Sequence, residues 1–271
     1  MNKHSRSLIL IFILFSVFLI GLYIYFYQFS ALPQEQSDLI LNLISVLAPL
    51  SSAIFATMIF LNFEPGDKPR EVWKHLTIFI WLWAVGEFIW AGYLIFTGDV
   101  PLPSVGDAFW LAGFVFLTIA LRKQYQSVTL KAVSLWQILA IWAGVFVAAY
   151  LVLLLSQTEA DLGNYLEFWY AVADFAAGIA AIRIFLAFRG GRLSRPWIGL
   201  FVLGLSDSIY AWLIATDMYA TSSAEGNLLS LVADTTYMAA YLVLATGFLA
   251  TYLTLKYGLD VSKIEVTQPE S

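Results

Sequence analysis

The sequence predicts an all-α integral membrane protein, with eight transmembrane helices arranged as two tandem four-helix repeats and with both termini cytoplasmic. Hydrophobic residues make up 61% of the 271-residue chain and charged residues only 12%. A chain with so few polar groups cannot cover a surface in water, so lipid must be its solvent. The apolar residues fall in eight runs, and most of these runs are near the ~20 residues that cross a bilayer.

The expected spans follow these apolar runs in order, with short polar or Pro- and Gly-containing segments between them. The first run is longer than the ~7–15 apolar residues of a signal-peptide core, so we interpret it as an uncleaved span. The fourth run is short and is expected to extend into its loop residues. The eight spans are 8–27, 39–61, 73–96, 108–121, 135–155, 165–188, 197–216 and 228–255.

The basic residues predict the orientation of these spans. With the N-terminus inside, all but one of the 14 Lys and Arg residues lie in inner segments, and the exception, Arg183, lies inside a span. The inner residues are Lys3, Arg6, Lys68, Arg70, Lys74, Arg122, Lys123, Lys131, Arg189, Arg192, Arg195, Lys256 and Lys263. The outer loops carry Glu35, Asp38, Asp99, Glu159, Asp161, Asp217 and Glu225. A missed or extra helix would scramble this segregation, so it favours eight spans.

An internal repeat predicts two similar units, 1–131 and 132–255, followed by a short polar cytoplasmic tail at 256–271. The sequence IFLNF at 59–63 and the sequence IFLAF at 184–188 each close a span before a basic loop. Four spans per unit give both copies the same topology, so the expected symmetry axis lies along the membrane normal.

Acidic residues recur within this repeat. Glu87 and Asp207 each lie about halfway along the next span, with Trp90 and Tyr210 three residues later. Asp107 and Asp234 then match, with Trp110 and Tyr237 three residues after them. Chance similarity between apolar segments is the alternative, but acids are rare in spans and their coincidence favours duplication.

Glu87, Asp174 and Asp207 are expected near the bilayer centre. A charged group there costs ~2.5–3.5 kcal/mol on insertion scales, so these side chains should face the bundle interior. Two interpretations are open for these acids and for the deeper-lying Asp234. They form a polar pocket or a proton or cation path, or each carboxyl bonds a Tyr, Trp, Ser or Thr of a neighbouring helix and locks the bundle.

Other polar residues have simpler expected roles. Asp107 comes in a first helical turn near the outer face, where a carboxylate caps free amides, whereas Asp234 lies too deep for capping to be persuasive. Arg183 is close enough to the inner end of its span to reach lipid phosphate, and we prefer this role to a role in gating. Pro101 and Pro103 stiffen an outer turn.

Several chemistries are excluded or disfavoured by what the sequence lacks. The chain has no Cys and only two His, both near predicted membrane edges, so no thiolate metal site and no bis-His haem is expected. No Lys lies inside a predicted span, which excludes a covalent retinal. There is no Walker loop, HExxH motif or nucleophile elbow. We therefore assign no catalytic residue and no metal site, and expect a protein that is not an enzyme.

Aromatic residues make up 17% of the chain. Four of them accompany the repeated acids and are candidates for lining an apolar ligand site: Trp90, Trp110, Tyr210 and Tyr237. Such a site would suit a lipid, a quinone or a carotenoid. The alternative is that aromatic side chains in the spans are lipid-facing bulk.

Two segments carry a resemblance to a known group of proteins. They are Gly86-Glu87-Phe-Ile-Trp90 and Pro101-Leu-Pro103-Ser104-Val-Gly-Asp107-Ala-Phe-Trp110, each with a weaker second copy. They resemble the duplicated multi-span sensory membrane regions found upstream of bacterial diguanylate cyclases and histidine kinases, where a Pro-Ser-x-x-Asp turn followed by aromatics recurs. No cyclase or kinase output domain is present in this sequence. The resemblance therefore implies a sensory module that works through a separate partner.

Three functions are consistent with the sequence. The first is a non-enzymatic sensory or signalling module. The second is an accessory subunit of a larger membrane complex that seats lipid, quinone or pigment. The third is a proton- or cation-coupled transporter that uses the buried carboxylates. Expected partners are the lipid bilayer of the inner (cytoplasmic) membrane and a protein in the membrane or at its cytoplasmic face. The basic loops are topology signals, so no nucleic-acid partner is expected.

Overall fold

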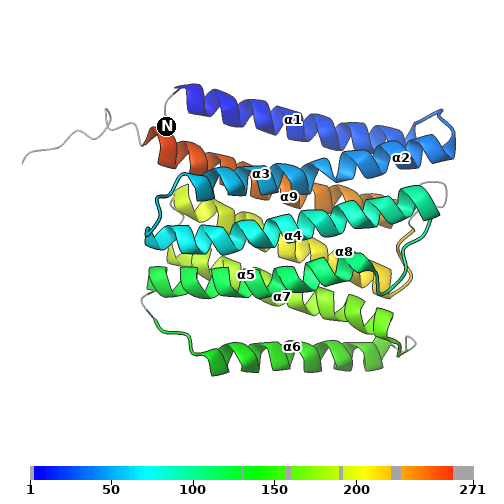
Figure 1. The fold of residues 1–271 in the computed structure, drawn as a ribbon. Coiled ribbons are helices and arrows are strands. Elements are labelled where there is room, and N and C mark those ends of the chain that lie inside the picture. The colour runs from blue at the N-terminus through cyan, green and yellow to red at the C-terminus, as the bar shows by residue number, and fades with distance from the viewer. Residues whose placement is uncertain (1–2, 130, 157–159, 189–191, 221–226, 259–271) are drawn as a thin grey trace, which may run out of the picture.

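A computed structural model describes residues 3–129, 131–156, 160–188, 192–220 and 227–258 (Figure 1). These described residues form nine α-helices and one short 3-10 helix, with no strand among them. The elements are α1 (Lys3–Gln28), α2 (Gln34–Ser45), α3 (Leu47–Leu61), α4 (Lys68–Thr97), α5 (Val105–Thr129), α6 (Leu135–Ser156), α7 (Leu162–Ala187), η1 (Arg192–Ser194), α8 (Arg195–Ala215) and α9 (Leu228–Tyr257).

Eight segments of the described chain are long and apolar enough to cross a membrane, as the sequence predicts. Their helices run side by side in one bundle (Figure 1). The last helix, α9, packs against α1, α3 and α8. It is also the most buried span, with 67% of its most apolar stretch buried against 17% for α6. The core of the bundle therefore forms around α9, and α6 lies at the edge.

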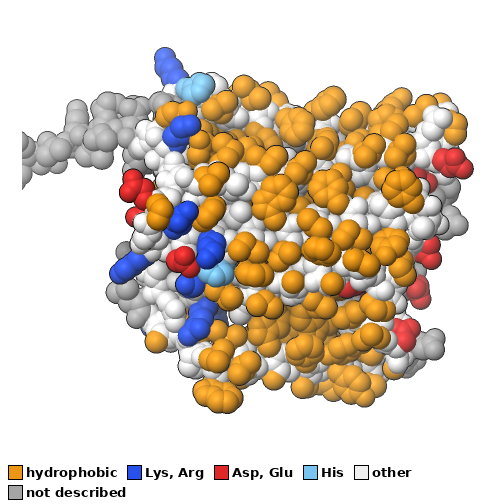
Figure 2. Space-filling model, viewed as in Figure 1, with side chains coloured by type: hydrophobic (Ala, Val, Ile, Leu, Met, Phe, Trp, Pro, Cys, Tyr) orange, Lys and Arg blue, Asp and Glu red, His pale blue; other side chains and the backbone are white. Residues whose placement is uncertain are grey.

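The two ends of the helical bundle differ in charge (Figure 2). The start of α1 and the end of α9 lie at the same end, where the rings of His4 and Tyr257 are 6.3 Å apart. We call this the basic end, because the spans begin or finish there beside Lys3, Arg6, Lys68, Lys74, Arg122, Lys123, Arg195 and Lys256. The opposite, acidic end has loops and helix starts with Glu35, Asp38, Asp99, Asp161 and Asp217.

The second span differs from its prediction as a single helix over 39–61. It begins at Gln34 and consists of α2 and α3, which meet at Val46. Pro49 has no amide hydrogen to donate to the Ser45 carbonyl one turn earlier, which interrupts the helical bonding at this point. At the same turn the Ser45 hydroxyl donates to the carbonyl of Asn42 at 2.9 Å. The break still leaves one continuous membrane-length segment.

The fourth span is longer than the predicted 108–121. Helix α5 continues to Thr129 through Arg122 and Lys123. The apolar run ends at these charges, but the helix does not, because basic residues are good helix formers. The extra turns project α5 beyond its apolar part at the basic end.

Several predicted charges lie outside the described residues. They are Glu159, Arg189, Glu225 and Lys263, and the predicted tail is described only at 256–258. The predicted boundary between the two units, at 131/132, falls in the segment between α5 and α6.

Candidate functional site

Paired glycines and indoles set the crossing of α4 and α5. Gly86 lies directly beneath the indole of Trp110, and Gly113 lies beneath the indole of Trp83. A Cβ atom on either glycine would overlap the facing ring. The Trp83 indole nitrogen also donates to the backbone carbonyl of Trp110 at 3.3 Å. This close approach, typical of small residues at membrane helix crossings, holds Glu87 beside α5.

A second close crossing brings two acids together on α7 and α8. Gly178 and Gly204 face each other there, and a Cβ atom on Gly204 would meet the Asp174 carbonyl oxygen at 2.5 Å. Asp174 precedes Gly178 by about one turn, and Asp207 follows Gly204 by about one turn. Their carboxyl groups therefore meet across the crossing, within hydrogen-bonding reach of each other.

Glu87 is held by a phenol from the central helix. The hydroxyl of Tyr237 on α9 donates to Glu87 Oε1 at 2.7 Å. The same hydroxyl lies 3.3 Å from that of Tyr241, one turn further along α9. Glu87 thus links α4 to the most buried span.

Asp234 accepts hydrogen bonds from two tyrosine hydroxyls that come from different parts of the chain. Tyr23 on α1 donates to Asp234 Oδ2 at 2.8 Å, and Tyr219, in the segment between α8 and α9, donates to Oδ1 at 2.8 Å. Asp234 is only 8% exposed. Asp234 is therefore buried, and its two hydrogen bonds join α9 to α1 and to the segment between α8 and α9.

Tyr210 on α8 connects these two groups. Its ring centroid lies 4.9 Å from that of Tyr219 and 5.1 Å from that of Tyr237, and it is stacked on the latter. We call the connected set the carboxyl–tyrosine cluster. It consists of Glu87, Asp207 and Asp234 with Tyr23, Tyr210, Tyr219 and Tyr237.

Two small cavities lie within this cluster. Their volumes are about 60 and 50 Å³, and they share Glu87, Trp90, Tyr210 and Tyr237 as lining residues. The acids that line one or both are Asp38, Glu87, Glu167, Asp207 and Asp234. Among the described residues, no Lys or Arg lines either cavity. A water molecule needs ~10–15 Å³ of such volume and a few polar partners, so each cavity has room for more than one.

The cavities reach toward the acidic end and are closed toward the basic end. The larger one extends to Tyr27 and Asp38, close to the acidic ends of α1 and α2. In the opposite direction the core is filled by Trp73, Trp197 and Phe248, which are 6%, 1% and 0% exposed. The rings of Trp197 and Phe248 lie 6.4 and 5.9 Å from that of Trp73. The two cavities therefore occupy one half of the bundle.

Asp107 lies apart from the two cavities and has a different environment. It accepts hydrogen bonds from the backbone amide and the hydroxyl of Ser104, while the Ser104 hydroxyl accepts from the amide of Gly106 at 3.1 Å. This is a capping box at the start of α5. The other carboxyl oxygen of Asp107 accepts from Tyr170 on α7 at 2.8 Å. Asp107 therefore both caps its helix and ties it to α7.

The remaining predicted residues lie at the surface. Pro101 and Pro103 are exposed in the turn before α5, where the Leu102–Pro103 peptide bond is cis. Arg183 is exposed on α7, whereas Asp174 on the same helix is 1% exposed. Arg183 therefore lies away from the buried acids.

The four aromatic residues proposed for an apolar ligand come together around the smaller cavity. Trp90, Trp110, Tyr210 and Tyr237 all line it, together with three acids. At about 50 Å³, it is far below the ~300–1,000 Å³ typical of ligand pockets. A larger space, of about 660 Å³, lies between α5, α6 and α7.

Sequence reasoning missed most of the phenols that hold the acids. Tyr23, Tyr170 and Tyr219 have no local pattern that marks them as partners of a carboxyl. Only Tyr237 carried a signal, through the repeated spacing of an aromatic residue three positions after the acid.

The acids have no arrangement suited to a metal ion. Among the described residues, no group of three or more His, Cys, Asp or Glu side chains could hold one. The ion pair found in the described part of the chain, Lys123 Nζ to Glu71 at 3.7 Å, is exposed at the basic end. Glu87, Asp107 and Asp234 therefore accept hydrogen bonds from phenols and not from bases. Asp174 Oδ2 is buried without a hydrogen-bond partner among the described residues.

The described fold and site define a multi-span helical membrane protein with a buried carboxyl–tyrosine cluster. No protein-family model, curated protein or solved structure matches the chain. The resemblance to sensory membrane regions therefore rests on the segments around Glu87 and Asp107.

Proposed function

We propose that the protein is a non-enzymatic sensory module of the inner membrane. The carboxyl–tyrosine cluster is its input site, and a separate protein reads its state at the basic end. The observation that carries this proposal is the pair of neighbouring cavities, which share four lining residues and are lined by five acids and, in the described chain, by no base. The basic residues of the helical bundle supply the orientation, with the acidic end outside.

The chemistry of the lining favours a small cation as the stimulus. A cleft lined by one sign of charge, with walls of low dielectric constant, concentrates ions of the opposite sign. Cavities of about 60 and 50 Å³ admit water-sized species only. We therefore expect a proton carried by water, or a cation the size of ammonium.

The closed half of the bundle favours a sensor over a transporter. A proton or cation path must continue to the other side of the membrane. The described core toward the basic end is packed with Trp73, Trp197 and Phe248. A stimulus that enters the cavities can therefore shift the helices that line them, but in the described core it meets these packed aromatic side chains on the way to the basic end.

A conformational reporter at the basic end tests this proposal. Because the chain has no Cys, Glu64→Cys in the segment between α3 and α4 gives a single attachment point for an environment-sensitive fluorophore. The labelled protein in nanodiscs is moved from neutral to mildly acidic buffer or, separately, given ammonium at constant pH. The fluorescence should change with at least one stimulus, and Glu87→Gln/Asp207→Asn should abolish that change.

Two outcomes would overturn the proposal. One is an equal fluorescence change in the labelled protein with the natural cluster and in the labelled double variant. The other is proton or ammonium flux through proteoliposomes that the double variant abolishes, because that result identifies a transporter. Lys256→Gln, a charge change at the basic end and away from the cavities, is the matched control and should respond normally.

A further inference from the structure

Helix α6 leaves the bundle at its basic end. It packs against α7, and its three buried residues, Val145, Ala149 and Leu153, lie from its middle toward its acidic end. The first half of α6 therefore stands away from α5. Figure 1 shows α6 as the outermost helix on this side of the bundle.

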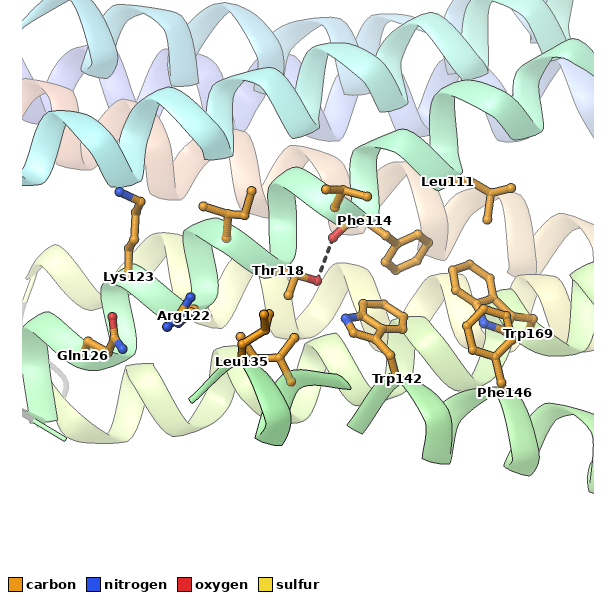
Figure 3. A pocket seen from close by; sticks show the side chains of 13 residues that line it. Leu111, Phe114, Thr118, Arg122, Lys123, Gln126, Leu135, Trp142, Phe146 and Trp169 are labelled. Carbon is orange, nitrogen blue, oxygen red and sulfur yellow. Dashed lines mark hydrogen bonds between the residues drawn. The ribbon is translucent and has the colours of Figure 1, made fainter. Parts of the chain in front are cut away.

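A groove of about 660 Å³ occupies the space between α5, α6 and α7 (Figure 3). Most of its lining is apolar and comes from side chains such as Leu111, Phe114, Ile138 and Trp142. The hydroxyl of Thr118 donates to the carbonyl of Phe114 in its own helix at 2.7 Å, so it has no hydrogen to donate into the groove. The middle of the groove therefore suits hydrocarbon.

The polar residues of the groove gather at the basic end. Arg122, Lys123 and Gln126 line it there, with the Lys123 ammonium turned toward Glu71 of α4, and the aromatic rings of Trp142 and Trp169 lie further along (Figure 3). Arg122 Nε and Gln126 Nε2 both donate to the carbonyl of Val133, at 3.0 and 3.3 Å. These bonds tie the segment before α6 to the end of α5. They leave the outer guanidinium nitrogens of Arg122 without a carboxylate partner among the described residues.

The length of the groove corresponds to one leaflet. From Leu111 to Arg122, α5 rises by about 16 Å at 1.5 Å per residue. Half of a hydrocarbon core of ~30 Å is about the same. A molecule lying along this groove would have its hydrocarbon beside α5 and its head at Arg122 and Lys123, at the depth of the lipid head groups.

We propose that this groove binds one phospholipid with an anionic head group from the leaflet at the basic end. The acyl chains lie against the apolar faces of α5 and α6, and the phosphate meets Arg122 and Lys123. Charge complementarity selects the head group, because the groove ends in two cations. The exposed Lys123–Glu71 pair, with side chains 40% and 51% exposed, is too weakly held to prevent this contact.

Native mass spectrometry after extraction from mixed nanodiscs tests the proposal. The nanodiscs contain equal amounts of phosphatidylglycerol and phosphatidylcholine with identical acyl chains. The protein should retain one phosphatidylglycerol molecule in preference to phosphatidylcholine. Because each basic residue near a membrane surface adds about 1 kcal/mol of attraction to anionic lipid, Arg122→Gln/Lys123→Gln should reduce that preference about tenfold or more.

Two further variants make the result specific. Lys68→Gln/Lys74→Gln removes the same charge from α4 at the same end and should retain the lipid normally. Thr118→Phe fills the groove without changing charge and should lose retention of both lipids. The proposal is overturned if the unaltered protein shows no preference, if the Arg122/Lys123 variant retains the lipid normally, or if the α4 variant loses it equally. Unchanged retention in folded Thr118→Phe would also overturn it.

Discussion

The hydroxyl of Tyr237 donates to Glu87 at 2.7 Å across 150 residues of sequence. This bond joins α4 to the central helix α9 in the half of the bundle that holds the polar cavities. Glu87 therefore has a structural role as well as a place in the proposed input site. The two interpretations that the sequence left open for the buried acids are compatible at this residue.

Removing the Tyr237 hydroxyl should destabilise the bundle. Tyr237→Phe removes this donor from the partly buried Glu87, and loss of a hydrogen-bond partner inside a protein costs about 1–3 kcal/mol. Thermal unfolding in detergent should show a lower midpoint. Tyr150→Phe on α6, where the side chain is 52% exposed, is the matched control and should unfold like the unaltered protein. Equal midpoints for the two variants would contradict the role of this bond.

The close crossing of α4 and α5 predicts that Gly86 tolerates no larger residue. In Gly86→Ala the new methyl group would overlap the indole of Trp110, and overpacking of this kind costs about 1–3 kcal/mol. The matched control is Gly92→Ala on the same helix, where no atom lies within 4 Å of the added Cβ. Chemical denaturation should show lower stability for the first variant only. A neutral Gly86→Ala would mean that the helices are further apart than described.

The capping box at the start of α5 predicts a local effect. Ser104→Ala removes the acceptor for the Gly106 amide and one donor to Asp107, at a cost of about 1 kcal/mol. Hydrogen exchange should increase in the first turn of α5. Ser51→Ala, which removes an exposed hydroxyl bonded to the Leu47 carbonyl of its own helix, should leave exchange there unchanged. The capping role is refuted if Ser104→Ala leaves exchange in that turn unaltered.

The predicted orientation can be tested because the chain has no Cys. In intact cells, a membrane-impermeant maleimide should label Asp99→Cys at the acidic end. It should label Glu64→Cys at the basic end only after the membrane is opened. The reverse pattern would place the acidic end in the cytoplasm, and the proposed external stimulus could not reach the cavities.

The eight spans could be predicted because crossing lipid requires a long apolar run, which is a local property of the sequence. The predicted ends and breaks of the helices, which depend on particular residues, were less accurate. The break at Val46 follows from Pro49, and the extension of α5 past Arg122 follows from helix formation by polar residues. The tandem repeat stays a prediction.

The pairing of the acids could not be predicted, because their donors are distant in sequence. Tyr170 bonds an acid 63 residues away, Tyr237 one 150 residues away and Tyr23 one 211 residues away. The groove beside α6 was missed for a related reason. The mean hydropathy is highest in the two least buried spans, at 2.7 in α6 and 2.8 in α1, against 1.7 in the most buried span, α9. Hydropathy thus reflects exposure to lipid, but it does not show which neighbouring helix α6 stands away from, because that depends on contacts between segments distant in sequence.

The proposed input site depends on buried carboxyl groups that respond to a small cation. Infrared difference spectroscopy of the protein in nanodiscs, between neutral and mildly acidic buffer, observes the carboxyl groups directly. We predict a difference band from a buried carboxyl C=O stretch that shifts in Tyr237→Phe and is lost in Glu87→Gln/Asp207→Asn. A spectrum with no such band, or a band identical in both variants, would contradict the assignment of the input site to the carboxyl–tyrosine cluster.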